Sequence, residues 1–199
     1  MLKQAFIAIA TTFISFQIMA ANTVVEMKTS MGNIEIELFN DKAPISAKNL
    51  ESYVKDNFYN GTVFHRVIPD FMIQGGGMDV KMTEKQTRAP IQNESYNGLK
   101  NTRGTLAMAR TNHPNSATSQ FFINTVDNDF LNKSQMNAGY AVFGKVTKGM
   151  NVVDQITKVP TANMGMHQNV PKQTIKIISM TIKSKDNRNK EKIKIAISL

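Results

Sequence analysis

The chain has 199 residues, of which 41% are hydrophobic and 20% are charged. This length suits one globular domain with a substantial core, and this composition excludes a chain that is disordered throughout. A net charge of +9 permits an attraction to nucleic acid or anionic lipid but does not show one. The chain has no cysteine, which excludes thiol nucleophiles and disulfide bonds.

The N-terminus has the three-part layout of a secretory signal peptide over residues 1–20. Lys3 precedes an apolar run over residues 5–19, and small residues follow at Ala20 and Ala21. We expect cleavage between these two alanines. An uncleaved membrane anchor is the alternative, although the run is short for a span and polar residues dilute it. No other segment has so long an apolar run, so no membrane span is expected after cleavage.

The body of the chain, residues 21–183, has mainly period-two patterning. Residues 33–39 place three apolar side chains on one face and two glutamates on the other, which is typical of a half-buried strand. A turn at 30–33 joins them to a partner strand at 23–28. Six further strands are predicted at 62–68, 71–74, 106–109, 121–124, 140–146 and 174–182. Eight short strands favour a sandwich or a closed barrel.

Two helices are predicted among these strands. Residues 44–59 carry apolar residues at helical spacing, begin at Pro44 and stop at an Asn-Gly pair. Residues 149–157 repeat the pattern over a shorter stretch. No internal repeat or low-complexity linker interrupts the body. The sequence therefore predicts one mainly β domain with two capping helices.

The C-terminal tail, residues 184–199, differs in composition from the body. It holds five basic and two acidic residues, a net charge of +3. A solvated extension, with a weak edge strand at 192–198, is one interpretation. An electrostatic contact with an anionic surface is the other.

Most familiar catalytic and metal-binding patterns are missing. His65, His113 and His167 have no ligand-like spacing, and no G-x-S-x-G sequence occurs. We therefore expect no metal site and no Ser/His triad. The glycine run at 75–77 lacks the Lys-Ser/Thr of a phosphate-binding loop, so it permits either a close backbone approach or a bend in a strand.

The most informative stretch, residues 64–77, reads FHRVIPDFMIQGGG and sets Arg66 in an apolar strand. Strict alternation predicts that Phe64, Arg66 and Ile68 face one side. His65 and Val67 then face the other. Read alone, Arg66 would be a surface arginine in a cross-strand ion pair.

Two later segments carry the resemblance to a known family. They read LAMARTNHPNSATSQFFIN at 106–124 and NDFLNKSQMNAGYAVFGKV at 128–146. With them, residues 24–182 resemble the cyclophilins, which are peptidyl-prolyl cis-trans isomerases, and most of all the short exported cyclophilins of Gram-negative bacteria. The resemblance implies an eight-stranded antiparallel closed β-barrel capped by two α-helices, with peptide bound on its outer face. It also implies a periplasmic monomer that acts on proline-containing unfolded or partly folded polypeptides, without a cofactor or a nucleic-acid partner.

The resemblance also implies roles for particular residues. Isomerisation of an X-Pro bond crosses a barrier of about 20 kcal/mol without making a covalent bond, so a catalyst need only favour the twisted amide. Twisting leaves a lone pair on the prolyl nitrogen, which a fixed hydrogen-bond donor stabilises. By resemblance Arg66 is that donor and Gln74 orients it. The implied substrate-binding residues are Phe71, Met72, Ala109, Arg110, Gln120, Phe122, Phe130, Leu131 and Tyr140.

Three of these positions depart from the commonest eukaryotic pattern. Arg110 stands where an asparagine is usual, Phe130 where a tryptophan is usual, and Tyr140 where a histidine is usual. The contact at the first position is largely through the main chain, so peptide binding should survive there. Loss of the indole N–H predicts weak cyclosporin binding with isomerase activity retained.

Two other classes of function are consistent with the sequence. A cyclophilin-like fold can act as a non-catalytic peptide-binding chaperone module. An inactive member would be expected to lose one of Arg66, Phe71, Gln74 or Phe122, and all four are present. A basic surface-binding or nucleic-acid-binding protein is the second alternative. It would lose a salt-sensitive interaction on deletion of residues 184–199 while keeping isomerase activity.

Overall fold

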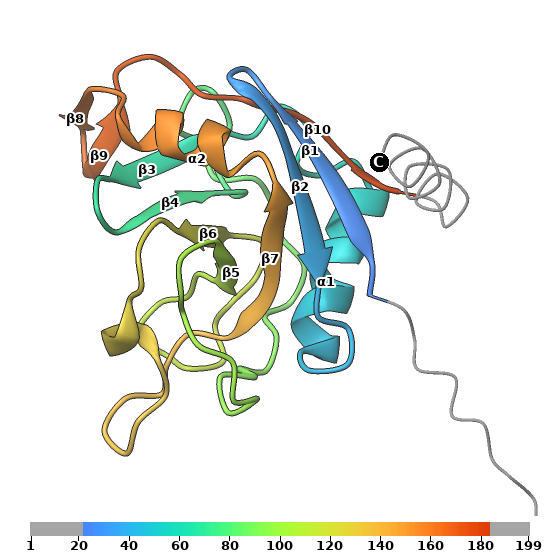
Figure 1. The fold of residues 1–199 in the computed structure, drawn as a ribbon. Coiled ribbons are helices and arrows are strands. Elements are labelled where there is room, and N and C mark those ends of the chain that lie inside the picture. Colours follow the sequence, from blue (N-terminus) through green and yellow to red (C-terminus); the bar gives the residue numbers. More distant parts are fainter. Residues whose placement is uncertain (1–21, 184–199) are drawn as a thin grey trace, which may run out of the picture.

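A curled antiparallel sheet of eight strands forms the body of the protein. The computed structural model describes residues 22–183, so the predicted signal peptide and the basic tail lie outside the described residues. The strand order in the sheet is β10-β1-β2-β7-β5-β6-β4-β3 (Figure 1). The strands are β1 (Val24–Thr29), β2 (Gly32–Leu38), β3 (Phe64–Ile68), β4 (Met72–Gly75), β5 (Thr105–Met108), β6 (Phe121–Asn124), β7 (Val142–Lys148) and β10 (Ile177–Ile182). The mainly β, eight-strand part of the prediction is confirmed.

The first and last strands of this order approach each other. Val63 and Lys176 form an isolated bridge just before β3 and β10 begin. Beside it the N–H of Phe64 donates to the carbonyl of Ile175 at 3.0 Å. Within residues 22–183 no longer ladder joins β3 to β10, so the described sheet is a half-barrel and complete closure stays a prediction.

Two helices accompany the sheet, α1 (Pro44–Lys55) and α2 (Met150–Thr157), as predicted in number and place. The predicted end of the first helix, at residue 59, was wrong. The chain leaves the helix after Lys55, and Asn57 takes a left-handed φ of 55°. Phe58 nevertheless packs against the core, which is why helical spacing continued to that residue.

A small hairpin of β8 (Thr161–Met164) and β9 (His167–Pro171) was not predicted. Residues 162–164 of β8 are exposed. The strand therefore lacks the alternation of apolar and polar residues by which a half-buried strand is predicted. The hairpin lies beside β3 (Figure 1), and β9 packs against that strand. A single 3-10 turn, η1 (Asp129–Leu131), was also missed.

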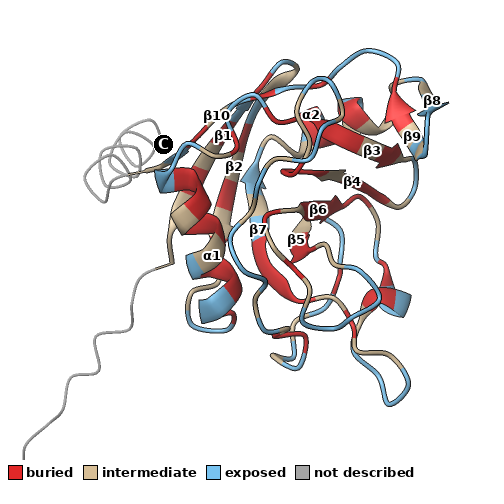
Figure 2. Cartoon of the chain, turned by 180° about the vertical axis from the view of Figure 1, so that it is seen from behind, coloured by how far each residue is buried: buried red, intermediate tan, exposed pale blue. Residues whose placement is uncertain are grey.

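Apolar side chains form two clusters. The larger gathers residues from both helices and most strands, including Phe121 and Ile123 of β6. The smaller is built around Met72, Phe122 and Leu131. β6 is therefore buried on both faces (Figure 2), which accounts for its run of apolar residues from Phe121 to Ile123. The smaller cluster forms the floor of the site described below.

The N-terminus of α1 is capped by a distant carboxylate. Ala43, at the cap position, offers no side-chain acceptor. Instead the carboxylate of Glu94 accepts hydrogen bonds from the N–H of Ile45 at 3.0 Å, the N–H of Ser46 at 2.8 Å and the hydroxyl of Ser46 at 2.7 Å. Glu94 is 3% exposed, so these bonds satisfy a buried charge and the free helix donors together.

Candidate active site

A β-bulge in β3 sets the direction of Arg66. The pairing of β3 with β4 shifts between Phe64 and Arg66, which leaves His65 as an extra residue. Phe64 therefore joins Val67 in the larger core, and Ile68 packs against the smaller cluster. The prediction that Phe64 shares the face of Arg66 was wrong, because a bulge reverses the alternation at one point.

Arg66 begins a row of neighbours that runs across the sheet. It pairs with Gln74 of β4, which pairs with Phe122 of β6, which in turn pairs with Ala107 of β5. Residues directly opposite each other on antiparallel strands share a face. A guanidinium group, an amide and an aromatic ring thus lie side by side on one surface.

An apolar pocket of about 110 Å³ opens on this surface. Its base is buried, and the ring of Tyr140 meets that of Phe122 edge-on at 5.7 Å. The pocket is lined by Arg66, Phe71, Met72, Gln74, Ala109, Arg110, Phe122, Leu131 and Tyr140. The structure thus brings together nine of the eleven residues proposed from the sequence, leaving Gln120 and Phe130 outside the lining.

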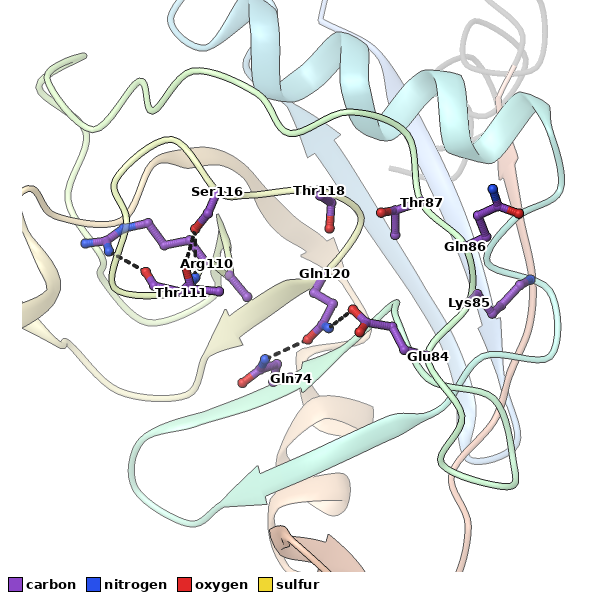
Figure 3. A pocket seen from close by; sticks show the side chains of 11 residues that line it. Gln74, Glu84, Lys85, Gln86, Thr87, Arg110, Thr111, Ser116, Thr118 and Gln120 are labelled. Atoms are coloured by element: carbon purple, nitrogen blue, oxygen red, sulfur yellow. Dashed lines mark hydrogen bonds between the residues drawn. The ribbon is translucent and has the colours of Figure 1, made fainter.

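A chain of hydrogen bonds holds Arg66 from one side. Its Nη1 donates to Oε1 of Gln74 at 3.4 Å, and Nε2 of Gln74 donates to Oε1 of Gln120 at 3.0 Å. Nε2 of Gln120 then donates to a carboxylate oxygen of Glu84 at 3.4 Å, as Figure 3 shows. Gln120 thus acts on the pocket through Gln74. Sequence reasoning missed Glu84, since no local pattern connects it to a residue 36 positions away.

The last residue of the glycine run makes room for this chain. A Cβ atom on Gly77 would lie 2.4 Å from Cγ of Gln120, closer than unbonded carbon atoms approach. Of the two interpretations left open for residues 75–77, the structure supports a close approach. Glycine at 77 lets the Gln120 side chain lie where it meets Gln74.

A larger polar cleft of about 510 Å³ adjoins the apolar pocket. The two share Gln74, Ala109 and Arg110, so they form one continuous groove. The remaining residues of the cleft are Glu84, Lys85, Gln86, Thr87, Thr111, Ser116, Thr118 and Gln120 (Figure 3). An extended chain can therefore place one residue in the apolar pocket and its neighbours along polar groups.

The side chain of Arg110 is used within the protein. Its Nε and Nη2 donate to the carbonyl of Gly139 at 3.1 and 3.0 Å, and its guanidinium lies 4.4 Å from the centre of the Tyr140 ring. These contacts hold Tyr140 in place as a wall of the pocket.

Phe130 supports the pocket from outside. Phe130 is 66% exposed, and its ring stacks on that of Phe71 with 5.5 Å between the centroids. Leu131, the next residue of η1, is 8% exposed and reaches the lining. Phe130 thus presents an open aromatic face beside the pocket mouth.

Within residues 22–183 no helix is long and apolar enough to cross a membrane. The same residues hold no group of three or more His, Cys, Asp or Glu side chains that could bind a metal ion.

The curled eight-strand antiparallel sheet with two helices is a cyclophilin fold. A family model described as "Cyclophilin type peptidyl-prolyl cis-trans isomerase/CLD" matches residues 24–182. The chain therefore belongs to the cyclophilin-type peptidyl-prolyl cis-trans isomerases, and this is its enzymatic activity.

Comparisons with individual proteins agree with this assignment. The chain is 70% identical over 184 residues to a peptidyl-prolyl cis-trans isomerase of Acinetobacter baylyi, covering 92% of this chain and 97% of the relative. It is 56% identical to peptidyl-prolyl cis-trans isomerase B of Escherichia coli K12, covering 80% and 99%. A crystal structure of a Cryptosporidium parvum cyclophilin-type isomerase in the presence of the dipeptide Ala-Pro is similar, with a TM-score of 0.67, 29% identity, and coverage of 81% and 99%.

Proposed function

We propose that Arg66 and the apolar pocket carry out the isomerisation together. The observation that carries this proposal is the position of the Arg66 guanidinium, held by Gln74 on the lining of a 110 Å³ apolar pocket. A proline ring is apolar and compact, and Phe122, Met72 and Leu131 offer it a buried surface. The presence of Ala-Pro with the similar solved isomerase is consistent with such a ligand.

In this mechanism the pocket fixes the proline ring while the preceding amide rotates. At the twisted state the prolyl nitrogen regains its lone pair, and Arg66 donates a hydrogen bond to it. The guanidinium interacts less with either planar amide, whose nitrogen lone pair is delocalised, so the bond lowers the barrier. Arginine suits the role because it stays charged and its donors are rigid. The polar cleft binds the residues of the substrate that neighbour the proline.

A direct test of this function is NMR exchange spectroscopy on a short Ala-Pro peptide with the purified chain. The uncatalysed bond interconverts over tens to hundreds of seconds. With the enzyme present, the cis–trans interconversion should become fast enough to give exchange cross-peaks between the two isomers. Competition by a proline-containing peptide, but not by the same peptide with alanine for proline, would support the apolar pocket as the binding site.

We also infer that the enzyme works on exported polypeptides in the periplasm, as a monomer, and so assists their folding. The support for export is the leader-like sequence over residues 1–20. Mass spectrometry of protein from a periplasmic extract should find an N-terminus at or next to Ala21. Recovery of the intact leader in the cytoplasmic fraction would contradict export, and a dimer mass by light scattering would contradict the monomer.

Replacing Gln74 with leucine should lower kcat by roughly tenfold and leave KM nearly unchanged. Leucine keeps the bulk of the side chain but removes the acceptor for Arg66 and the donor to Gln120. Arg66 would then sample positions in which its donor misses the amide nitrogen. Gln86→Leu is the matched control, because Gln86 lines the polar cleft outside this hydrogen-bonded chain. An equal loss in both variants would mean that Gln74 does not position the arginine.

Cyclosporin should bind weakly while isomerase activity is retained. Phe130 offers an exposed ring without a hydrogen-bond donor at the position where a tryptophan is usual among eukaryotic relatives. Titration of the isomerase rate with cyclosporin measures this. Inhibition at nanomolar concentrations would contradict the prediction.

A further inference from the structure

The tip of the β8–β9 hairpin presents two thioethers and an imidazole. The sequence there is Met164-Gly165-Met166-His167, with Gly165 and Met166 forming the turn. Met164 is 54% exposed and Met166 is 97% exposed. Among residues 22–183 the one other exposed methionine is Met136, on a separate loop. These two exposed side chains do not contribute to the packing of the core.

The register of the hairpin places one thioether and one imidazole on the same face. Met164 and His167 are direct partners in the β8–β9 ladder. Partners in an antiparallel pair share a face, with Cβ atoms about 5 Å apart. Met166 lies in the two-residue turn between them, so its flexible side chain can reach the same point.

A second imidazole lies behind the hairpin on β3. His65 is the extra residue of the bulge, it is 6% exposed, and its Nδ1 has no hydrogen-bond partner among the described residues. His65 lies on β3, and His167 begins β9, which packs against β3. A buried nitrogen without a partner is uncommon and calls for a role.

We propose that this tip binds a soft monovalent cation, Cu(I), through Met164, Met166 and His167. His65 supplies a further nitrogen behind these ligands. Thioether sulfur favours Cu(I), and imidazole also binds copper. The chain has no cysteine to compete for the ion. Residues 161–171 contain no Asp or Glu, so the hairpin itself offers no carboxylate to attract Mg²⁺ or Ca²⁺.

The site is separate from the peptide groove. No residue of β8 or β9 lines the apolar pocket or the polar cleft. Substitution of the methionines should therefore leave the basal isomerase rate unchanged, which also serves as a check on folding.

The test is anaerobic titration of the tag-free protein with Cu(I) in competition with bicinchoninate. We expect one Cu(I) per chain. Met164→Leu and Met166→Leu each remove a sulfur while keeping apolar bulk, and each should weaken binding by about tenfold or more. Met136→Leu is the matched control, an exposed methionine away from the hairpin, and should bind as the native protein does. Addition of Ag(I), a redox-inert substitute, should shift the NMR signals of residues 164–167 and of His65.

Three results would overturn the proposal. The first is no binding in competition with the chelator. The second is binding that survives in the Met164→Leu/Met166→Leu double variant, and the third is an equal loss in Met136→Leu. If instead the double variant loses affinity for an unfolded polypeptide while the native protein takes up no Cu(I), the hairpin is an apolar contact surface and not a metal site.

Discussion

Replacement of Arg66 by alanine is expected to lower kcat/KM for an X-Pro peptide by about 10²- to 10³-fold. A loss of this size is typical when an enzyme loses one fixed hydrogen-bond donor that acts mainly on the transition state. The effect should fall on kcat, because the apolar pocket that holds the proline ring keeps the rest of its lining. NMR exchange on the same peptide, at several concentrations, separates kcat from KM.

Two comparisons sharpen this experiment. Arg88→Ala removes a guanidinium that pairs with Asp56 and lies outside the apolar pocket, so the rate should stay native. Arg66→Lys keeps the charge but loses the planar set of donors that meets Gln74, so it should recover little activity. Full activity in Arg66→Ala would rule out the donor mechanism while leaving the family assignment intact.

Replacement of Gly149 by alanine is expected to lower the free energy of unfolding by about 3 kcal/mol. Gly149 precedes α2 with a φ of 88°. An added Cβ would lie 2.3 Å from the carbonyl oxygen of Asn33 and 3.0 Å from Cα of Ile34. Both atoms belong to the backbone of β2, which pairs on both sides and has little freedom to move.

Gly98→Ala is the matched control for this stability effect. Gly98 has a similar φ of 80°, but nothing lies within 4 Å of its added Cβ. Its substitution should lower the free energy of unfolding only through the unfavourable backbone conformation, by about 1 kcal/mol. Thermal or urea unfolding measures both variants, and the melting temperature should fall by about 2–4 °C per kcal/mol. Equal losses at the two positions would show that the close approach to β2 contributes nothing.

Patterns of period two and 3.6 were sufficient to locate the strands of the sheet and both helices. They were insufficient where both faces of a strand are buried or both are exposed. β6 is the first case, and its apolar run left its faces unassigned. β8 is the second case and was missed altogether. A sandwich and a barrel share these patterns, so the curl of the sheet needed coordinates.

The candidate site could likewise be predicted only in part. Residues that belong to short motifs, such as Arg66 and Gln74, could be proposed from the family resemblance. Contacts between distant segments could not, which is why Glu84 was missed. The face of Phe64 was also wrong, because a bulge leaves no mark in the apolar pattern of β3.

The capping of α1 by Glu94 has a consequence for the order of folding. The helix has no side-chain cap of its own, and its first donors are satisfied by a residue 48 positions further along the chain. Closing so long a loop costs entropy before the contact forms. We therefore expect the first turn of α1 to form late and not to nucleate folding by itself. The amide protons of Ile45 and Ser46 should gain protection from hydrogen exchange only when the segment that carries Glu94 has docked, and they report that step.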